Sequence, residues 1–213
     1  MSVDVQIWSD VVCPWCFVGK RRFEEAVRRF RDEGGEVTVT YRSHELSPTT
    51  PEHVEGDAAG HLARHLGVPR EQAAAMQAQM AELAAGEGLA YDFAALRPAN
   101  TLRAHQVLHL AREHGRQEAL KERLLQAHFE QGLDVADVAV LADLAAEVGL
   151  DRDAVVTALR DQTYLAAVRA DQAEGAGIGV RGVPFYVLDG RWGVSGAQAP
   201  ETFLDALRQA ASA

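Results

Sequence analysis

Cys13 and Cys16 are the only two cysteines in the chain, and Pro14 and Trp15 stand between them. A cysteine thiolate attacks a disulfide sulfur, and a second thiol nearby can displace the mixed disulfide that forms. A single CxxC pair in a chain without other cysteines is therefore typical of a redox-active dithiol. We predict that Cys13 attacks, that Cys16 resolves, and that Pro14 and Trp15 set the redox poise.

The residues around the pair predict a strand that leads directly into a helix. Val3, Val5 and Ile7 alternate with polar residues, which is typical of a short strand. Apolar residues then recur at helical spacing among charged ones: Phe17, Phe23, Val27 and Phe30. Cys13 should lie in the first turn, with Pro14 just inside it, where a missing N–H costs nothing. Because free N–H groups and the helix dipole stabilise an anion, we expect a lowered pKa for Cys13, as the outer sulfur.

Two other interpretations of the pair are open, namely a buried inert pair and half of a zinc site. A structural zinc site usually takes four ligands, with a second Cys or His pair at matching spacing. Two histidine pairs, His61 with His65 and His105 with His109, have one-turn spacing. Nothing in the sequence ties either pair to the cysteines, so we favour the redox dithiol and predict no metal.

The composition is that of a globular protein large enough for one domain with an insertion. The chain has 213 residues, of which 47% are hydrophobic and 24% charged, and its formal net charge is −10. This charge argues against nucleic acid as a partner, because phosphate contacts need clustered Lys and Arg. No secretory signal or membrane-length apolar stretch is visible in the sequence. We expect no membrane partner and a cytoplasmic location, where a CxxC pair is catalytic or redox-sensing.

Strand patterns occupy the two ends of the chain, and helical patterns occupy its middle. Residues 36–41 alternate and are rich in β-branched side chains, so they predict a second strand that completes a β-α-β unit. Cys13 then lies at the carboxyl end of the first strand, where such sheets hold their functional groups. The sequence predicts an α/β fold in which an all-α block at 51–176 separates residues 1–50 from 177–213.

Individual elements can be placed from periodicity and turn signals. Asp189-Gly190 predicts a hairpin between strands at 182–188 and 191–195, and 199–211 has the pattern of an amphipathic helix. The central block predicts helices at 61–66, 70–85, 101–114, 117–131, 138–148, 153–159 and 164–176.

Four stretches, at 9–16, 100–105, 182–185 and 195–198, together resemble the DsbA family of the thioredoxin superfamily. Within that family they are most similar to the FrnE-like branch of cytoplasmic oxidoreductases. The resemblance implies a thioredoxin fold with a large all-α insertion, the thioredoxin-like domain being made of the two end segments. It also implies a protein disulfide oxidoreductase that acts on the thiols of proteins or peptides.

The resemblance further implies a cis peptide bond between Val183 and Pro184 that faces Cys13. The backbone N–H and C=O of Val183 would then bind a substrate peptide as an added strand. Pro14 and Trp15 would complete the substrate-binding set beside them. No cofactor is expected, and glutathione is a candidate thiol partner.

The same scaffold also resembles kappa-class glutathione transferases and 2-hydroxychromene-2-carboxylate isomerases, which by resemblance use a serine where Cys13 stands. Asp10, Asn100, His105 and Ser195 could then line a glutathione-like or small-molecule pocket. More ordinary roles are a helix cap for Asp10, a helix N-terminal position for Asn100 and a core position for His105. As a further alternative, Asp10 could tune Cys16 or shuttle a proton for it.

A third interpretation is a redox-switched binding protein that uses the pair only as a switch. The sequence leaves open the direction of electron flow, the substrates, the recycling partner and the oligomeric state. The Ala-rich helical block could offer a dimer face.

Overall fold

Within residues 2–51 and 54–212, the part of the chain that the computed structural model describes, four strands form one sheet in the order β2-β1-β3-β4. The strands are β1 (Ser2–Ser9), β2 (Glu36–Ser43), β3 (Phe185–Leu188) and β4 (Trp192–Ser195). β1 pairs with β2 in parallel and with β3 in antiparallel orientation. The predicted β-α-β unit and the α/β class are confirmed, with the helical block between β2 and β3.

The chain divides into two units. The first unit consists of Met1–Leu46 and Ala166–Ala213, and the second consists of Ser47–Leu165. The sequence placed the boundaries at 50 and 177 instead. The difference is helix α8 (Leu165–Gly177), almost all of which belongs to the first unit. Its Ala-rich sequence resembles that of the insertion helices, so only its contacts reveal where it belongs.

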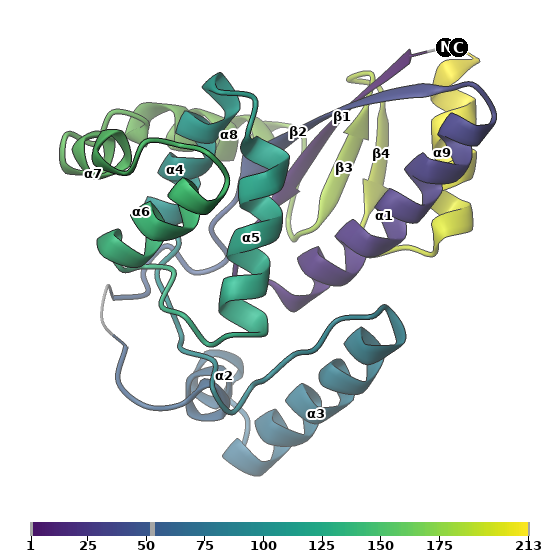
Figure 1. Cartoon of the computed structure of the whole chain (residues 1–213). Helices are drawn as coiled ribbons and strands as arrows, with labels where there is room; N and C mark the ends of the chain where they lie inside the picture. The colour runs from purple at the N-terminus through teal and green to yellow at the C-terminus, as the bar shows by residue number, and fades with distance from the viewer. Residues whose placement is uncertain (1, 52–53, 213) are drawn as a thin grey trace. The chain divides into compact units, whose positions relative to one another are not determined.

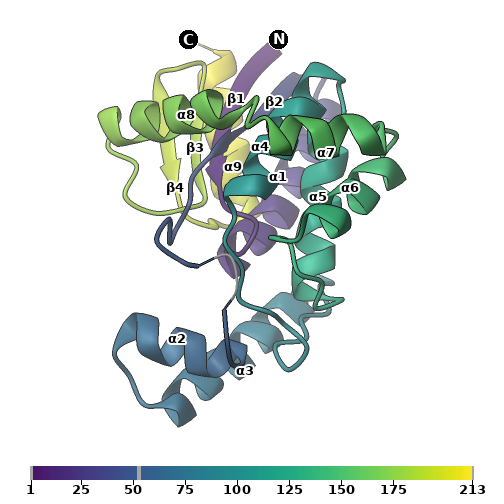
Figure 2. The same ribbon diagram turned by 90° about the vertical axis from the view of Figure 1, so that its left-hand side faces the viewer.

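Helices cover both faces of the sheet in the first unit. Helices α1 (Pro14–Asp32) and α9 (Pro200–Ala211) lie side by side on one face, and α8 lies on the other (Figures 1 and 2). Because side chains alternate along β1, Val3, Val5 and Ile7 face α1 and α9, whereas Trp8 faces α8. The core on the first face also takes in Phe23, Val27, Phe30, Tyr41, Tyr186, Leu188, Phe203, Leu204 and Leu207.

Polar contacts of Asp171 attach α8 to the sheet. The indole Nε1 of Trp8 donates to the Asp171 carbonyl over 2.8 Å. The carboxylate of Asp171 accepts from Arg42 Nη1 at 2.9 Å and from the backbone N–H of Ser43 at 2.8 Å. Asp171 is 2% exposed, so these bonds satisfy a buried carboxylate.

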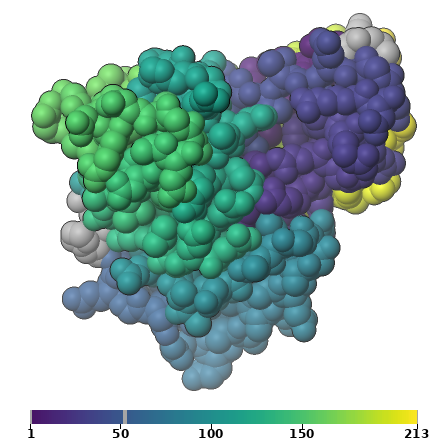
Figure 3. Space-filling view, in the orientation of Figure 1, coloured from purple at the N-terminus to yellow at the C-terminus, as the bar shows by residue number. Residues whose placement is uncertain are grey.

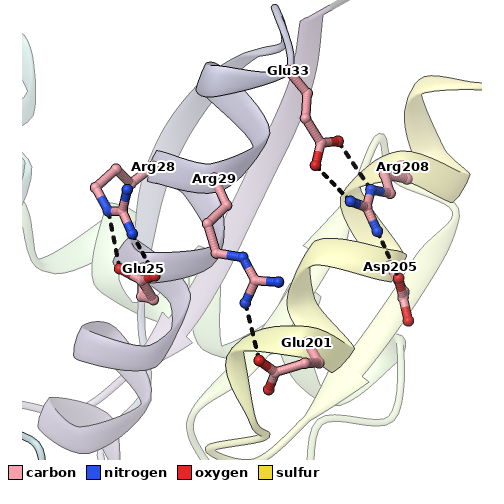
Figure 4. Close-up of polar contacts among 7 residues, drawn as sticks. All are labelled: Glu25, Arg28, Arg29, Glu33, Glu201, Asp205 and Arg208. Atoms are coloured by element: carbon pink, nitrogen blue, oxygen red, sulfur yellow. Dashed lines mark hydrogen bonds and ion pairs between the residues drawn. The ribbon is translucent and has the colours of Figure 1, made fainter.

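Ion pairs join α1 to α9 on their outer side (Figure 4). Arg29 pairs with Glu201 at 3.0 Å, and Arg208 Nε donates to Glu33 at 2.9 Å. In the space-filling view the side chains of α1 form an outer surface with those of α9 at its edge (Figure 3). Exposed pairs of this kind contribute little to stability, so burial of the apolar faces holds the two helices on the sheet.

The second unit consists of helices over the part that the structure describes. They are α2 (Ala58–Leu66), α3 (Arg70–Gly86), α4 (Leu102–Glu113), α5 (Gln117–Phe129), α6 (Val138–Glu147) and α7 (Arg152–Arg160). Each predicted helix is present, with ends shifted by a few residues at most. α2 begins three residues before the predicted start because the carboxylate of Asp57 caps it, accepting from Gly60 N at 2.8 Å.

The predicted hairpin is confirmed, with one correction to its first strand. Asp189 and Gly190 both have positive φ, 48° and 65°, and they lie at the centre of a turn in which Arg191 N donates to the Leu188 carbonyl over 3.0 Å. β3 begins at Phe185 rather than at residue 182. Pro184 has no N–H to donate to a neighbouring strand, so regular pairing starts only after it.

Candidate active site

Cys13 lies at the junction between β1 and α1, as its neighbours predict. It is the N-cap of α1, with an extended backbone (φ −90°, ψ 114°), and Pro14 occupies the first turn. The backbone N–H of Cys16 donates to the Cys13 carbonyl over 3.0 Å. The two cysteines therefore belong to one helical turn, and both are reduced thiols.

Both sulfur-bearing residues are buried, which corrects the expectation of an outer sulfur at Cys13. Cys13 is 4% exposed and Cys16 is 3% exposed. Trp15 between them is 44% exposed. Residues three apart share a helix face, so the first turn directs both cysteines inward and the intervening tryptophan outward.

The peptide bond between Val183 and Pro184 is cis, as the resemblance implied. The thiol of Cys13 donates a hydrogen bond to the Val183 carbonyl over 3.5 Å. The Pro184 carbonyl accepts from Gly196 N at 2.8 Å, which ties the loop after β4 to the same segment. The fold thus brings together Cys13 and a backbone segment 170 positions away.

The pKa of Cys13 is raised well above its usual value, which corrects the prediction that the helix N-terminus lowers it. The largest cause is a hydrogen bond with the Cys16 side chain, followed by burial. A hydrogen bond from the backbone N–H of Cys16 lowers the pKa of Cys13, but its effect is smaller than that of the causes that raise it. The Val183 carbonyl also accepts a hydrogen bond from the Cys13 thiol, and an acceptor of this kind favours the protonated form.

Asp10 follows β1 directly and precedes Cys13 by three residues. Its buried carboxylate accepts from the backbone N–H of Val11 and from that of Leu46, each at 2.8 Å. It therefore holds the loop before Cys13 against the segment that follows β2. Its negative charge contributes to the raised pKa of Cys13.

The other pocket candidates are divided between the two units. Ser195 ends β4 in the first unit, and its carbonyl accepts from Gln198 Nε2 at 2.7 Å. Asn100 and His105 belong to the second unit. Asn100 precedes α4 and accepts from Leu102 N at 3.0 Å, and His105 is 1% exposed. A pocket shared by these residues stays a prediction.

The sequence did not predict a role at the site for two residues near the Cys13–Cys16 pair, namely Gly19 and Tyr186. Tyr186 is 1% exposed, and burial, followed by the charges of Cys16 and Cys13, raises its pKa well above the usual value. A Cβ built on Gly19 would lie 2.8 Å from the Tyr186 hydroxyl oxygen. A glycine inside a helical pattern was the available signal, since such a residue often marks a close approach.

No cluster of three or more His, Cys, Asp or Glu side chains that could hold a metal ion occurs within residues 2–51 and 54–212. Over the same residues, every helix falls short of the length and apolar character of a membrane span.

Comparisons with known proteins agree with a thioredoxin fold that carries a dithiol at the start of its first helix. The model of the DSBA-like thioredoxin domain matches residues 4–208. An uncharacterised Bacillus subtilis protein, YwbO, is 31% identical over 165 residues, which cover 77% of this chain and 75% of that protein. The chain belongs to the DsbA-like thioredoxin domain family.

Solved structures with a similar fold cover nearly the whole chain. A probable DsbA oxidoreductase from Streptomyces coelicolor superposes with a TM-score of 0.89 at 42% identity, covering 99% of this chain and 90% of that one. A 2-hydroxychromene-2-carboxylate isomerase superposes with a TM-score of 0.67 at 16% identity, covering 100% and 95%. The second likeness concerns the fold alone, so the choice between the two chemistries depends on the site.

Proposed function

We propose that this DsbA-like protein catalyses thiol–disulfide exchange on cysteine-bearing proteins or peptides through Cys13 and Cys16. The observation that carries the proposal is the position of Cys13. It begins α1, shares a turn with Cys16, and lies 3.5 Å from the Val183 carbonyl. A backbone group beside the attacking sulfur suits an extended peptide that docks as an added strand.

The exchange transfers two electrons between the dithiol and a substrate disulfide. The Cys13 thiolate attacks one substrate sulfur, an S–S bond forms, and the other substrate sulfur leaves as a thiolate that takes up a proton. The Cys16 thiolate then attacks the Cys13 sulfur and expels the first substrate sulfur. The products are a reduced substrate and a Cys13–Cys16 disulfide, and the reverse sequence oxidises a substrate dithiol.

The hydrogen bond from Cys13 to Val183 couples the first step to substrate docking. In the reduced protein the Val183 carbonyl accepts a hydrogen bond from the Cys13 thiol. A sulfur in a mixed disulfide has no proton, so this carbonyl is then released to accept an N–H of the substrate chain. Trp15, which is exposed two residues after Cys13, offers an apolar surface to a docked chain.

The finer predictions from the sequence belong to the same proposal. These are membership of the FrnE-like branch, glutathione as a redox partner, and a pocket that includes Asp10, Asn100, His105 and Ser195. Retention of Cys16 supports the dithiol couple over transferase or isomerase chemistry, which by resemblance uses a serine at position 13.

Reduction of insulin disulfides and refolding of scrambled ribonuclease test the proposal. We expect turnover by the wild-type protein, none by Cys13→Ser, and accumulation of mixed disulfide without turnover by Cys16→Ser. Turnover that survives Cys16→Ser would favour monothiol or transferase chemistry. A wild-type protein that catalyses neither reaction would favour a redox-switched binding protein.

A further inference from the structure

Gly19 lies on α1, three residues beyond Cys16, at the place where this helix meets the segment that begins β3. A Cβ at this position would lie 2.8 Å from the Tyr186 hydroxyl oxygen and 2.9 Å from Pro184 Cγ. It would also lie 3.3 Å from Ala197 Cβ. Real Cβ atoms essentially never approach other atoms to within 3.0 Å, so any side chain here would force a displacement.

The atoms that face Gly19 have little freedom to move. Tyr186 is buried, and its ring packs against Phe23 and Phe203 with centroid distances of 5.2 Å and 4.6 Å. The Pro184 side chain is a ring closed onto the backbone nitrogen, and the carbonyl of the same residue accepts from Gly196 N. A side chain at position 19 would therefore push α1 away from residues 184–186 as a whole.

The contact at Gly19 also lies next to the Val183 backbone. Val183 precedes Pro184 directly, and its carbonyl is 3.5 Å from the sulfur of Cys13 on α1. A second link joins the helix to this region, because Arg22 Nη1 donates to the Ala197 carbonyl over 2.8 Å. A separation at Gly19 would thus be transmitted to the spacing between the attacking sulfur and the Val183 backbone.

We propose that Gly19 is a positioning residue for the exchange reaction. Its missing side chain lets Pro184 and Tyr186 close against α1, and this close packing sets the spacing between Cys13 and the docking backbone of Val183. The inference rests on the proposed function, and it concerns peptide docking rather than the reactivity of the sulfur itself.

The test compares two substrates in Gly19→Ala. One is a peptide disulfide, which needs the Val183 backbone, and the other is hydroxyethyl disulfide, which has no backbone to dock. We expect kcat/KM for the peptide to fall about tenfold, because misplaced groups cost rate steeply. The rate with hydroxyethyl disulfide should change by less than about twofold. The substrate ratio, which is the peptide rate divided by the hydroxyethyl disulfide rate, should therefore fall.

Two control variants separate positioning from general damage to the fold. In Gly86→Ala the new Cβ meets nothing within 4 Å, so both rates should stay at the wild-type values. In Gly175→Ala the new Cβ lies 2.6 Å from Trp8 Nε1 on the α8 side of the sheet. This second variant should lower the melting temperature and leave the substrate ratio unchanged.

If Gly19→Ala folds poorly, a second substitution that relieves the close contact provides a further test. Adding Tyr186→Phe removes the oxygen nearest to the new Cβ, so the double variant should recover part of the peptide rate. A Gly19→Ala protein with the wild-type substrate ratio, or a double variant without recovery, would overturn the inference. A wild-type protein inactive on both disulfides would instead refute the proposed function.

Discussion

The Cys13 thiol donates a hydrogen bond to the backbone carbonyl of Val183 across 3.5 Å, which joins the start of α1 to the segment before β3. An acceptor of this kind favours the protonated form of the sulfur. It also occupies the backbone group that a docked peptide would use. Reactivity and docking therefore depend on the same few atoms.

The alkylation of Cys13 should depend on pH as expected for a thiol that resists ionisation. Because the pKa of Cys13 is raised, its reaction with iodoacetamide should be slow at about pH 7 and should accelerate up to and beyond pH 9. Cys16→Ala removes the largest cause of the shift, so this variant should react faster at about pH 8. Mass spectrometry of quenched samples gives both rates. A wild-type rate that levels off near pH 7 would contradict the raised pKa.

The reduction potential of the Cys13–Cys16 pair should be far less oxidising than that of DsbA. A stabilised reduced form makes DsbA an oxidant, with a potential of about −120 mV, whereas thioredoxin lies near about −270 mV. Both cysteines are buried, and the Cys13 thiol donates to the Val183 carbonyl, so the geometry favours the neutral thiol over a stabilised thiolate. We expect a value below about −180 mV from equilibration with glutathione or dithiothreitol buffers. A potential near that of DsbA would show that another feature stabilises the reduced form.

The buried phenol of Tyr186 should make the folded state less stable at alkaline pH. Its folded pKa is raised, so above about pH 10 the unfolded chain releases a proton that the folded chain keeps. Below that pH, Tyr186 makes its full contribution to the free energy of unfolding. As the pH rises further, the free energy of unfolding falls by about 1.4 kcal/mol per pH unit until the folded pKa is reached. Urea unfolding at several pH values measures the slope.

A background that lacks both cysteines isolates this effect, since Cys13 has a raised pKa as well. In that background Tyr186→Phe should flatten the alkaline slope. An equal slope with and without the phenol would mean that Tyr186 ionises as readily in the folded state as in the unfolded one.

The buried carboxylate of Asp171 should contribute strongly to stability. Asp171→Ala leaves Arg42 and the N–H of Ser43 without this acceptor, and we expect a loss of about 3 kcal/mol in urea unfolding. The matched control is Glu33→Gln, which breaks the exposed pair with Arg208 shown in Figure 4. The control should leave the urea midpoint unchanged. Comparable losses in the two variants would argue against the role assigned to the α8 contact.

Local patterns sufficed for most of the secondary structure and for the start of α1. Strand alternation, helical periodicity and the turn signal at Asp189-Gly190 depend on neighbours in the chain, and the structure follows them closely. The cap position of Cys13 was equally accessible, because Pro14 marks the first turn. The assignment of α8 was not, since its contact through Asp171 joins segments far apart in the sequence.

By itself, the sequence determined that a lone dithiol stands at the beginning of a helix in an α/β chain with a helical block between its strands. Only the tertiary structure decided the state of that dithiol. It buries Cys13, places the Val183 carbonyl beside its sulfur and raises its pKa, where the helix N-terminus alone predicted the opposite. Burial and through-space hydrogen bonds come from packing between distant segments, and no local pattern of residues encodes them.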